Sequence, residues 1–341
     1  MTDVVLVVPD TIDDENAPSG GNVYDRRMRD GLAAREIAVA GAWPRPDEQA
    51  RAALGQSLDA LPDGAVVLLD GLVGCGVPEV VVPRAARLRL VVLVHMPLAD
   101  DVGLPADVAA ELDRREGQTL AAAATVVTTS RATARRLAAR HGLDGIEVVP
   151  PGADPAPLAA TSATGDRLLC VGSVSPLKGQ DVLVEALATL ADLPWHCRCV
   201  GPPRDPGFAA DLHERIERLG LSDRIRLVGP RTGELYADTD LVVLPSRAES
   251  YGMVVTEALA RGIPVAGSDV GGVPEALGDT AAGVPGLLVA PDDPAALAAA
   301  LRGWLTDAGL RHRLRAAARL RRDALEPWPD AARRMAEVLA P

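Results

Sequence analysis

Residues 241–257 read LVVLPSRAESYGMVVTE, and this stretch decides how the chain folds. Its apolar β-branched run, Leu241 to Leu244, predicts a buried strand, and an apolar helical pattern follows Gly252 after a polar loop. Glu249 stands ahead of the predicted helix and Glu257 inside it, with seven residues between them. The first amides of a helix have no acceptor within it, so a strand feeding a helix in this way predicts an anion-binding site.

The predicted helix start suggests that both glutamates contact one ligand. The amides of Met253 and Val254 are expected to face a phosphate, while Glu249 and Glu257 take hydroxyls on either side of it. Eight residues at helical rise span roughly 12 Å, which suits an elongated nucleotide-sugar. Paired carboxylates also suggest an acid and a base, as in glycoside hydrolysis, but a lysine in a neighbouring loop favours hydroxyl clamps.

Short apolar strands alternate with helical patterns along the whole chain of 341 residues, which predicts α/β domains with parallel, doubly wound sheets. A first helix is expected from about Val23 to Ala38, overlapping an extended run at Ile37–Ala40. The stretch 150–165, PPGADPAPLAATSATG, has the composition of a linker. We expect Rossmann-like domains at 1–154 and 155–326, followed by a last helical segment at 327–341.

The composition excludes several classes of protein. The formal net charge of −12 argues against nucleic-acid binding. There is no apolar run of eighteen residues and no basic leader, so no membrane span or signal peptide is predicted. The scattered cysteines lack zinc-ligand spacing and predict buried free thiols of a cytoplasmic protein. A homodimer is compatible with these features. The cysteines are Cys75, Cys170, Cys197 and Cys199.

Lys178 is the only lysine in a chain whose other long basic residues are all arginine. It lies in the loop VGSVSPLKG, 171–179, where a compact ammonium can neutralise a diphosphate; a residual surface lysine is the alternative. Gly20-Gly21 lies in the expected loop before the first helix, where paired glycines permit a phosphate to approach, although a plain turn explains them equally well. His95 ends the strand RLVVLVH, a position that a structural histidine also fits.

Together these pieces resemble the retaining glycosyltransferases of family four, which have the GT-B fold. The E-x7-E element at Glu249–Glu257, the flanking LPS and ALARGIPVAGSDVGGVPE, the VGSVSPLKG loop, the PPGAD element and the GGN loop stand in that family's order. The resemblance implies two Rossmann-like domains facing across a cleft, with a C-terminal helix that crosses back to the first domain. It also implies metal-independent transfer from a nucleoside-diphosphate sugar as co-substrate, with no cofactor and no metal site.

The resemblance also assigns roles to residues. Glu249, Lys178 and His95 would be catalytic, with Glu249 on the transferred sugar, Lys178 on the diphosphate and His95 beside the sugar. Trp328 matches the tryptophan where the chain crosses back, so the last helix should pack on the first domain. Donor binding would involve Gly21, Gly172, Ser173, Lys178, Arg231, Ser250, Tyr251, Gly252, Met253, Val254 and Glu257.

The chain departs from the family at Ser173, where an arginine is common. A lost charge-assisted contact there would weaken donor binding by ~1.5–3 kcal/mol unless another arginine, for which Arg231 is the candidate, replaces it. Uridine is the favoured donor base and guanosine the next; the acceptor would be a small molecule or lipid-linked. A sugar-nucleotide epimerase on the same scaffold and a non-catalytic donor-binding or partner subunit are the alternatives.

Overall fold

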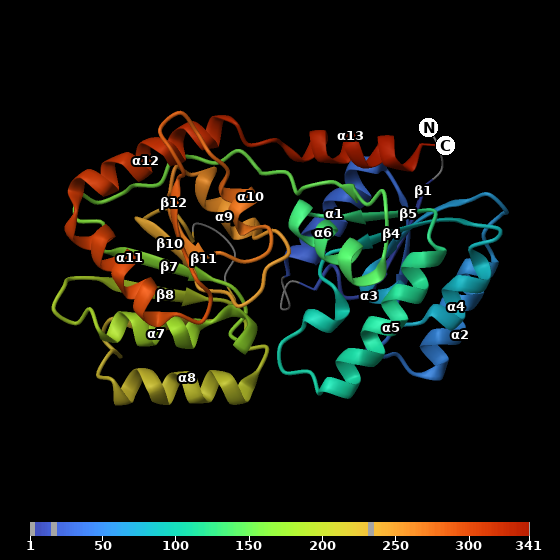
Figure 1. Ribbon diagram of the computed structural model, residues 1–341, viewed down its shortest axis with the longest axis horizontal. Helices are drawn as coiled ribbons and strands as arrows, with labels where there is room; N and C mark the ends of the chain where they lie inside the picture. Colours follow the sequence, from blue (N-terminus) through green and yellow to red (C-terminus); the bar gives the residue numbers. More distant parts are fainter. Residues whose placement is uncertain (1–3, 15–18, 231–234, 341) are drawn as a thin grey trace. The chain divides into compact units, whose positions relative to one another are not determined.

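The structure, a computed structural model, describes residues 4–14, 19–230 and 235–340 (Figure 1). The chain divides into two compact units. Unit 1 comprises Met1–Gly152 and Pro327–Pro341, and unit 2 comprises Ala153–Glu326. The sequence places the first boundary after residue 154, whereas the chain divides after Gly152. The segment 327–341 belongs to unit 1, so the C-terminal helix returns to the first unit as expected.

Unit 1 is built on a sheet of six strands in the order β2-β1-β3-β4-β5-β6, and all of its pairings are parallel. β1 and β3 consist of buried residues only, because helices cover both faces of such a sheet and leave no solvated side. The strands are β1 (Val4–Pro9), β2 (Arg35–Val39), β3 (Val66–Asp70), β4 (Arg89–Val94), β5 (Thr125–Thr128) and β6 (Glu147–Val148).

Unit 2 carries a second parallel sheet of six strands, in the order β12-β11-β10-β7-β8-β9. This is the Rossmann order, in which the first strand of the unit lies beside the fourth. The expected α/β fold with doubly wound parallel sheets is therefore confirmed. The strands are β7 (Arg167–Val171), β8 (His196–Val200), β9 (Ile225–Val228), β10 (Leu241–Leu244), β11 (Val265–Ser268) and β12 (Gly286–Val289).

Helices follow most of the strands and cover the sheets (Figure 1). Unit 1 holds α1 (Gly20–Leu32), α2 (Glu48–Asp59), α3 (Gly71–Gly74), α4 (Pro78–Val81), α5 (Ala106–Ala122), α6 (Arg131–His141) and α13 (Trp328–Leu339), with short 3-10 turns η1 (Val82–Arg84) and η2 (Leu98–Asp100). Unit 2 holds η3 (Pro176–Lys178), α7 (Gln180–Ala188), α8 (Pro206–Arg218), α9 (Met253–Leu259), α10 (Val273–Leu277), α11 (Pro294–Thr306) and α12 (Ala308–Asp323).

The first helix differs from the prediction at both ends. It begins at Gly20, because Ser19 accepts a hydrogen bond from the Asn22 amide at 3.0 Å, so the glycine pair forms its first turn instead of a preceding loop. It ends at Leu32, six residues before the predicted end. Ala33 adopts a left-handed conformation with φ 49° that closes the helix, and β2 starts almost at once.

The cores of both units are aliphatic, as the scarcity of aromatic residues requires. In unit 2 one core lies against α7, α8 and α11 and the other against α9 and α10, so each sheet face is covered. All four cysteines are buried and free, which confirms the predicted thiols. Cys197 and Cys199 share one core cluster, as expected from their spacing in β8.

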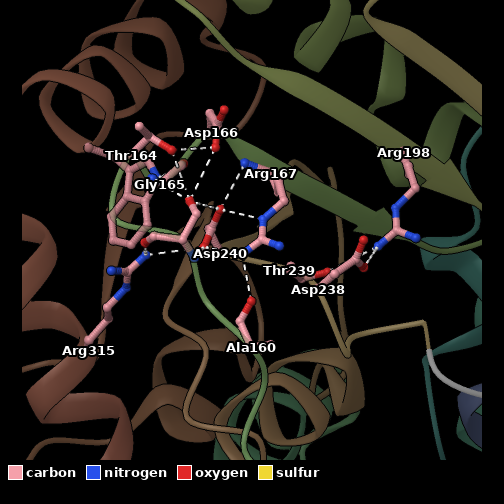
Figure 2. Close-up of polar contacts among 12 residues, drawn as sticks. Ala160, Thr164, Gly165, Asp166, Arg167, Arg198, Asp238, Thr239, Asp240 and Arg315 are labelled. Atoms are coloured by element: carbon pink, nitrogen blue, oxygen red, sulfur yellow. Dashed lines mark hydrogen bonds and ion pairs between the residues drawn. The ribbon is translucent and has the colours of Figure 1, made fainter.

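A buried carboxylate ties the linker to the sheet of unit 2. Asp240, fully buried just before β10, accepts hydrogen bonds from the Ser162 amide at 2.5 Å and the Ser162 hydroxyl at 2.7 Å. Figure 2 shows the guanidinium groups of Arg167 and Arg315 approaching the same carboxylate from two sides. A buried carboxylate requires such partners, so the incoming linker has a fixed path beside β7 and α12.

The returning helix α13 packs against α1 in unit 1. Trp328 lies edge-on to Tyr24 with ring centroids 5.8 Å apart, and the Tyr24 hydroxyl donates to the Val149 carbonyl at 2.9 Å. A Cβ on Gly152 would lie 2.4 Å from the backbone of Trp328, which explains the glycine of the PPGAD element. Throughout the described residues, each helix is too short or too polar to cross a lipid bilayer.

Candidate functional site

Lys178 and Glu249 form an ion pair in unit 2. The Lys178 ammonium lies 2.5 Å from Oε1 of Glu249, and the Ser246 hydroxyl donates to the same oxygen at 2.8 Å. Lys178 follows β7 and Glu249 follows β10, and these neighbouring strands mark the point where the strand order reverses. Ligands of doubly wound sheets bind at that point, beyond the carboxyl ends of the strands. The structure thus joins two of the three predicted catalytic side chains.

Arg247 fastens the loop of Lys178 to the loop of Glu249. Its amide donates to the Leu177 carbonyl at 2.9 Å, and its guanidinium donates to the Pro176 carbonyl. The same guanidinium binds both carboxylate oxygens of Asp181, at 3.0 and 2.8 Å, and its Nε donates to Asp292 at 2.6 Å. These charged contacts fix the relative position of the two loops. By sequence alone, Arg247 has no predicted role.

Two glycines are needed for the same loops to meet. A Cβ on Gly179, which has φ 64°, would lie 2.1 Å from the Pro245 carbonyl oxygen. A Cβ on Gly271, which has φ 50°, would lie only 1.6 Å from the Glu249 carbonyl oxygen. Both positions therefore require glycine for space as well as for conformation. Gly271 lies in the GGVPE stretch, which by sequence alone is also compatible with a simple turn.

The N-terminus of α9 follows directly after this loop. Gly252 has φ 88° and precedes the first helical residue, Met253. Val254 and Met253 are partly buried against the core of unit 2, and the Tyr251 side chain is buried in it. With Ser250 just before them, the backbone groups around the helix start lie next to Glu249 in the chain. The predicted strand, loop and helix of residues 241–257 are confirmed; their contacts with a donor stay a prediction.

Glu257 lies inside α9 and has a tyrosine as its partner. The Tyr236 hydroxyl donates to Oε2 of Glu257 at 2.6 Å, and the Arg261 guanidinium lies 4.6 Å from the centre of the Tyr236 ring. Burial raises the pKa of Glu257, and the Tyr236 hydrogen bond and the Arg261 charge only partly oppose this, while the charge of Asp154 adds to it. Tyr236 was not a predicted site residue, and its distance in sequence gives no signal for it.

Of the residues expected to bind the diphosphate through the loop after β7, the structure describes Gly172 and Ser173. Gly172 directly follows β7, and a Cβ at this position would lie 3.4 Å from the aliphatic part of the Lys178 side chain. The Ser173 carbonyl accepts a hydrogen bond at 2.9 Å from the side-chain amide of Gln180. This contact ties the loop to the start of α7. Arg231, the candidate replacement for the missing arginine, lies outside the described residues.

In unit 1, His95 belongs to a cluster with two buried carboxylates. Its Nε2 lies 2.9 Å from Oδ1 of Asp25, a residue of α1, and Asp70 ends the neighbouring strand β3. Potential ligand atoms of the three side chains all lie within 4.8 Å of one another. A Cβ on Gly21 would lie 3.3 Å from the His95 ring, so Gly21 leaves room for that ring. Only His95 and Gly21 of this cluster were predicted site residues.

The electrostatics of this cluster follow from burial and proximity. Burial alone would lower the pKa of His95, but the charge and hydrogen bond of Asp25, with the charge of Asp70, raise it to about 9. Burial raises the pKa of Asp70 well above its ordinary value, and the neighbouring Asp25 charge adds to this. The arrangement therefore favours a protonated imidazole beside Asp25 near neutral pH.

A second cluster in unit 1 has the residue types of a metal site, but one of its carboxylates forms an ion pair with an arginine. Glu116 lies 3.1 Å from Nε2 of His141 and accepts from the Leu98 amide, while Asp113 pairs with Arg140 at 3.3 Å. Within the described ranges, this group and the His95 cluster are the ones whose donor atoms lie close enough for a metal ion. A guanidinium beside Asp113 already supplies the positive charge that a cation would bring.

Comparison with known proteins identifies relatives of unit 2 and of the chain as a whole. The family described as glycosyl transferases group 1 matches residues 160–321. A D-inositol 3-phosphate glycosyltransferase of Xylanimonas cellulosilytica is 36% identical over 251 residues, which cover 66% of this chain and 58% of that protein. The chain spans about half the length of the curated relatives it matches.

Solved structures support the fold. Sucrose-phosphate synthase from Thermosynechococcus elongatus superposes with a TM-score of 0.79 at 20% identity, covering 99% of this chain and 98% of that one. HepE of Anabaena, solved with UDP and glucose, gives a TM-score of 0.77 at 18% identity and covers 99% of both chains. Identities this low bear on architecture alone.

Proposed function

We propose that the chain, whose residues 160–321 match the family of glycosyl transferases group 1, is a retaining, metal-independent glycosyltransferase. It moves a sugar from a nucleoside-diphosphate sugar, preferably a uridine and next a guanosine derivative, to a hydroxyl of an acceptor. The relatives named for inositol phosphate and the neighbour solved with UDP support this choice. The four buried free thiols support a cytoplasmic location, because reducing compartments preserve such thiols.

The observation that carries the proposal is the Lys178–Glu249 pair at the strand-order reversal of unit 2. A doubly wound sheet binds its ligand there, and the pair offers one cation and one carboxylate side by side. The ammonium suits a diphosphate, and the carboxylate suits the hydroxyls of a sugar. A single donor with phosphate next to sugar matches both groups at once.

The reaction divides the work among these groups. The bond between the anomeric carbon and the diphosphate oxygen breaks, the acceptor oxygen forms a new bond on the same face, and its proton passes to the leaving phosphate. Lys178 and the amides of Met253 and Val254 stabilise the charge that develops on the diphosphate. Glu249 orients the sugar, so its role is positional and electrostatic. When a donor binds, Lys178 exchanges Glu249 for phosphate oxygens.

The remaining contacts lie on either side of this centre. Glu257, oriented by Tyr236, takes the ribose hydroxyls. His95 lies beside the donor sugar and Gly21 beside the phosphate, each contributed by unit 1. The further donor contacts proposed are those of Gly172, Ser173, Arg231, Ser250, Tyr251 and Gly252.

A donor panel tests the proposal. UDP- and GDP-sugars are incubated with wild type, Lys178→Ala, Glu257→Ala and the exposed control Arg218→Ala, and nucleotide release is measured with and without acceptors that include inositol phosphates and lipid-linked alcohols. Wild type and Arg218→Ala should release nucleotide far faster than the two site variants. Equal rates in all four proteins with every donor would show that the site is elsewhere. Epimerised donor formed without any acceptor would indicate an epimerase instead.

A further inference from the structure

The cluster of Asp25, Asp70 and His95 contains one carboxylate oxygen that needs a partner. Asp25 is 1% exposed, and its Oδ2 is buried without a hydrogen-bond partner among the described residues. Its other oxygen, Oδ1, lies 2.9 Å from His95 Nε2. A buried, ionised carboxylate with one bare oxygen is costly, so a donor or a cation is expected there.

Asp70 is the side chain placed to supply that donor. It is 4% exposed, and its Oδ1 accepts from the Leu72 amide at 2.6 Å, which anchors one half of its carboxyl group at the start of α3. It ends β3, while Asp25 lies on the helix after β1, and these strands are neighbours where the strand order of unit 1 reverses. Two carboxylates with oxygen atoms within 4.8 Å of each other oppose each other's ionisation, which raises the pKa of one of them.

We propose that Asp70 is protonated and donates to Oδ2 of Asp25, so that Asp25 stays ionised and holds His95 as an imidazolium through Nε2. Each buried group then has a partner. The protonated Asp70 carboxyl donates to Oδ2 of Asp25, and Oδ1 of Asp25 accepts from the His95 ring. Asp25 and Asp70 are positioning residues, and His95, 18% exposed, is the member of the chain of contacts that can meet a ligand. Its Nδ1 then becomes a charged donor for a sugar hydroxyl or a phosphate oxygen.

The residues packed around His95, other than Asp25 and Asp70, add no charge next to its ring. From α1, Gly21 contributes no charge, and Tyr24, edge-on to the His95 ring at 5.3 Å, is kept neutral because burial raises its pKa. The charge of Arg334, in α13, acts to lower the pKa of Tyr24 and only partly opposes the effect of burial. Asp25, from α1, and an ionised Asp70, from the end of β3, each raise the pKa of His95; if Asp70 is protonated, Asp25 is the group that does so.

The test is a proton NMR titration of the full chain, which has only five histidines, with His95→Gln assigning the His95 signal. In wild type the midpoint of the His95 signal should lie well above its ordinary value of about 6.5. Asp25→Asn should move it towards the ordinary value of about 6.5. Asp70→Asn should leave it in place, because the amide can donate to Asp25 and its carbonyl can still accept from Leu72. Asp70→Leu, which has no group to donate to Asp25, should shift the midpoint of the His95 signal away from its wild-type value.

Several outcomes would overturn the proposal. Asp70→Asn lowering the midpoint as far as Asp25→Asn would mean that Asp70 acts as an ionised carboxylate. A wild-type midpoint near 6.5 would mean that His95 is not held as a cation. Equimolar Zn²⁺ or Mn²⁺ binding that Asp25→Asn abolishes would give Oδ2 a metal partner instead of a proton.

The role of this contact chain in sugar transfer rests on the proposed function and is measured separately. Nucleotide release should be slower in Asp70→Leu than in Asp70→Asn, with the difference in kcat more than in KM. If the NMR results hold and no donor is turned over by any variant, the charge arrangement stands and the proposed function fails.

Discussion

The Lys178 ammonium and the Glu249 carboxylate are each other's partners, 2.5 Å apart. The two groups that the sequence assigns to different parts of a donor are thus paired across two loops. Under the proposed function, a phosphate replaces Glu249 as the partner of Lys178, so donor binding would include an exchange of ion pairs. Each of these partly buried groups keeps the other from being an unpaired charge until that exchange occurs.

Replacing Lys178 should affect turnover more than donor binding. Because its charge is most needed when the diphosphate leaves, Lys178→Met is expected to lower kcat by about 10²–10³, in the range seen on loss of one preorganised donor. Lys178→Arg should recover only part of this, since a planar fork does not reproduce a point charge. Steady-state kinetics with the preferred donor measure both, and Arg218→Met serves as the exposed control. A change confined to KM would contradict the assignment.

Arg247 should control the register of the two loops. Arg247→Met removes the contacts to Asp181, Asp292 and the Pro176 carbonyl, so Lys178 and Glu249 lose their fixed separation. We expect lower kcat and higher KM together, with a loss of about 1–3 kcal/mol in the free energy of unfolding. Urea unfolding and kinetics measure these changes. Arg302→Met, which breaks an exposed pair with Asp192, is the control and should change little.

Gly271→Ala should disable the site while the fold survives. The new methyl group would meet the Glu249 carbonyl, and the loop that carries Glu249 must move. Gly283→Ala is a matched control, because Gly283 has a φ of 93° with open space around its Cβ position. Both variants share the conformational strain of alanine at positive φ, but only Gly271→Ala should lose most of its nucleotide release. Equal losses would mean that strain, not the contact, matters.

Asp240 should be a major stabilising residue of unit 2. Asp240→Ala leaves Arg167 and Arg315 without their shared carboxylate in a buried setting, so the free energy of unfolding is expected to fall by about 3–5 kcal/mol. Asp238→Ala, which breaks the exposed pair with Arg198 visible in Figure 2, should cost at most about 1 kcal/mol. Chemical unfolding followed by circular dichroism compares the two. Similar values for both would argue against Asp240 as the anchor of the linker.

His95 should make stability depend on pH in a defined direction. Its pKa in the folded chain, about 9, lies above its ordinary value of 6.5, so its contribution is fully present below pH 6.5 and is lost as the pH rises through 9. The difference in free energy of unfolding between wild type and His95→Gln should shrink by roughly 3 kcal/mol over that interval. A difference that stays constant or grows would contradict the cationic assignment.

Local patterns in the sequence were sufficient for most of the fold. The strand at Leu241–Leu244 follows from periodicity, and the return of the last helix to unit 1 follows from the family resemblance. The end of α1 was missed because Ala33, which closes it in a left-handed conformation, is a residue that favours helix. Such an ending depends on tertiary packing.

Candidate site residues stand out in the sequence where they lie in one motif and not where distant segments meet. Glu249 and Lys178 stand out through spacing and composition, whereas Asp25 and Asp70 meet His95 only after three segments have folded together. Asp70 did carry one signal, since it directly ends an apolar strand run. Arg247 gave none, because its partners Asp181 and Asp292 lie far away along the chain.

The division of the chain also sets the order in which its parts can be completed. Unit 2 is continuous in sequence, but unit 1 requires α13, which a ribosome makes after all of unit 2. Until then, Tyr24 and Gly152 lack the Trp328 surface that packs on them. A nascent chain can therefore finish its second unit before its first, and a shortened chain ending near residue 326 would leave unit 1 with an exposed apolar face along α1.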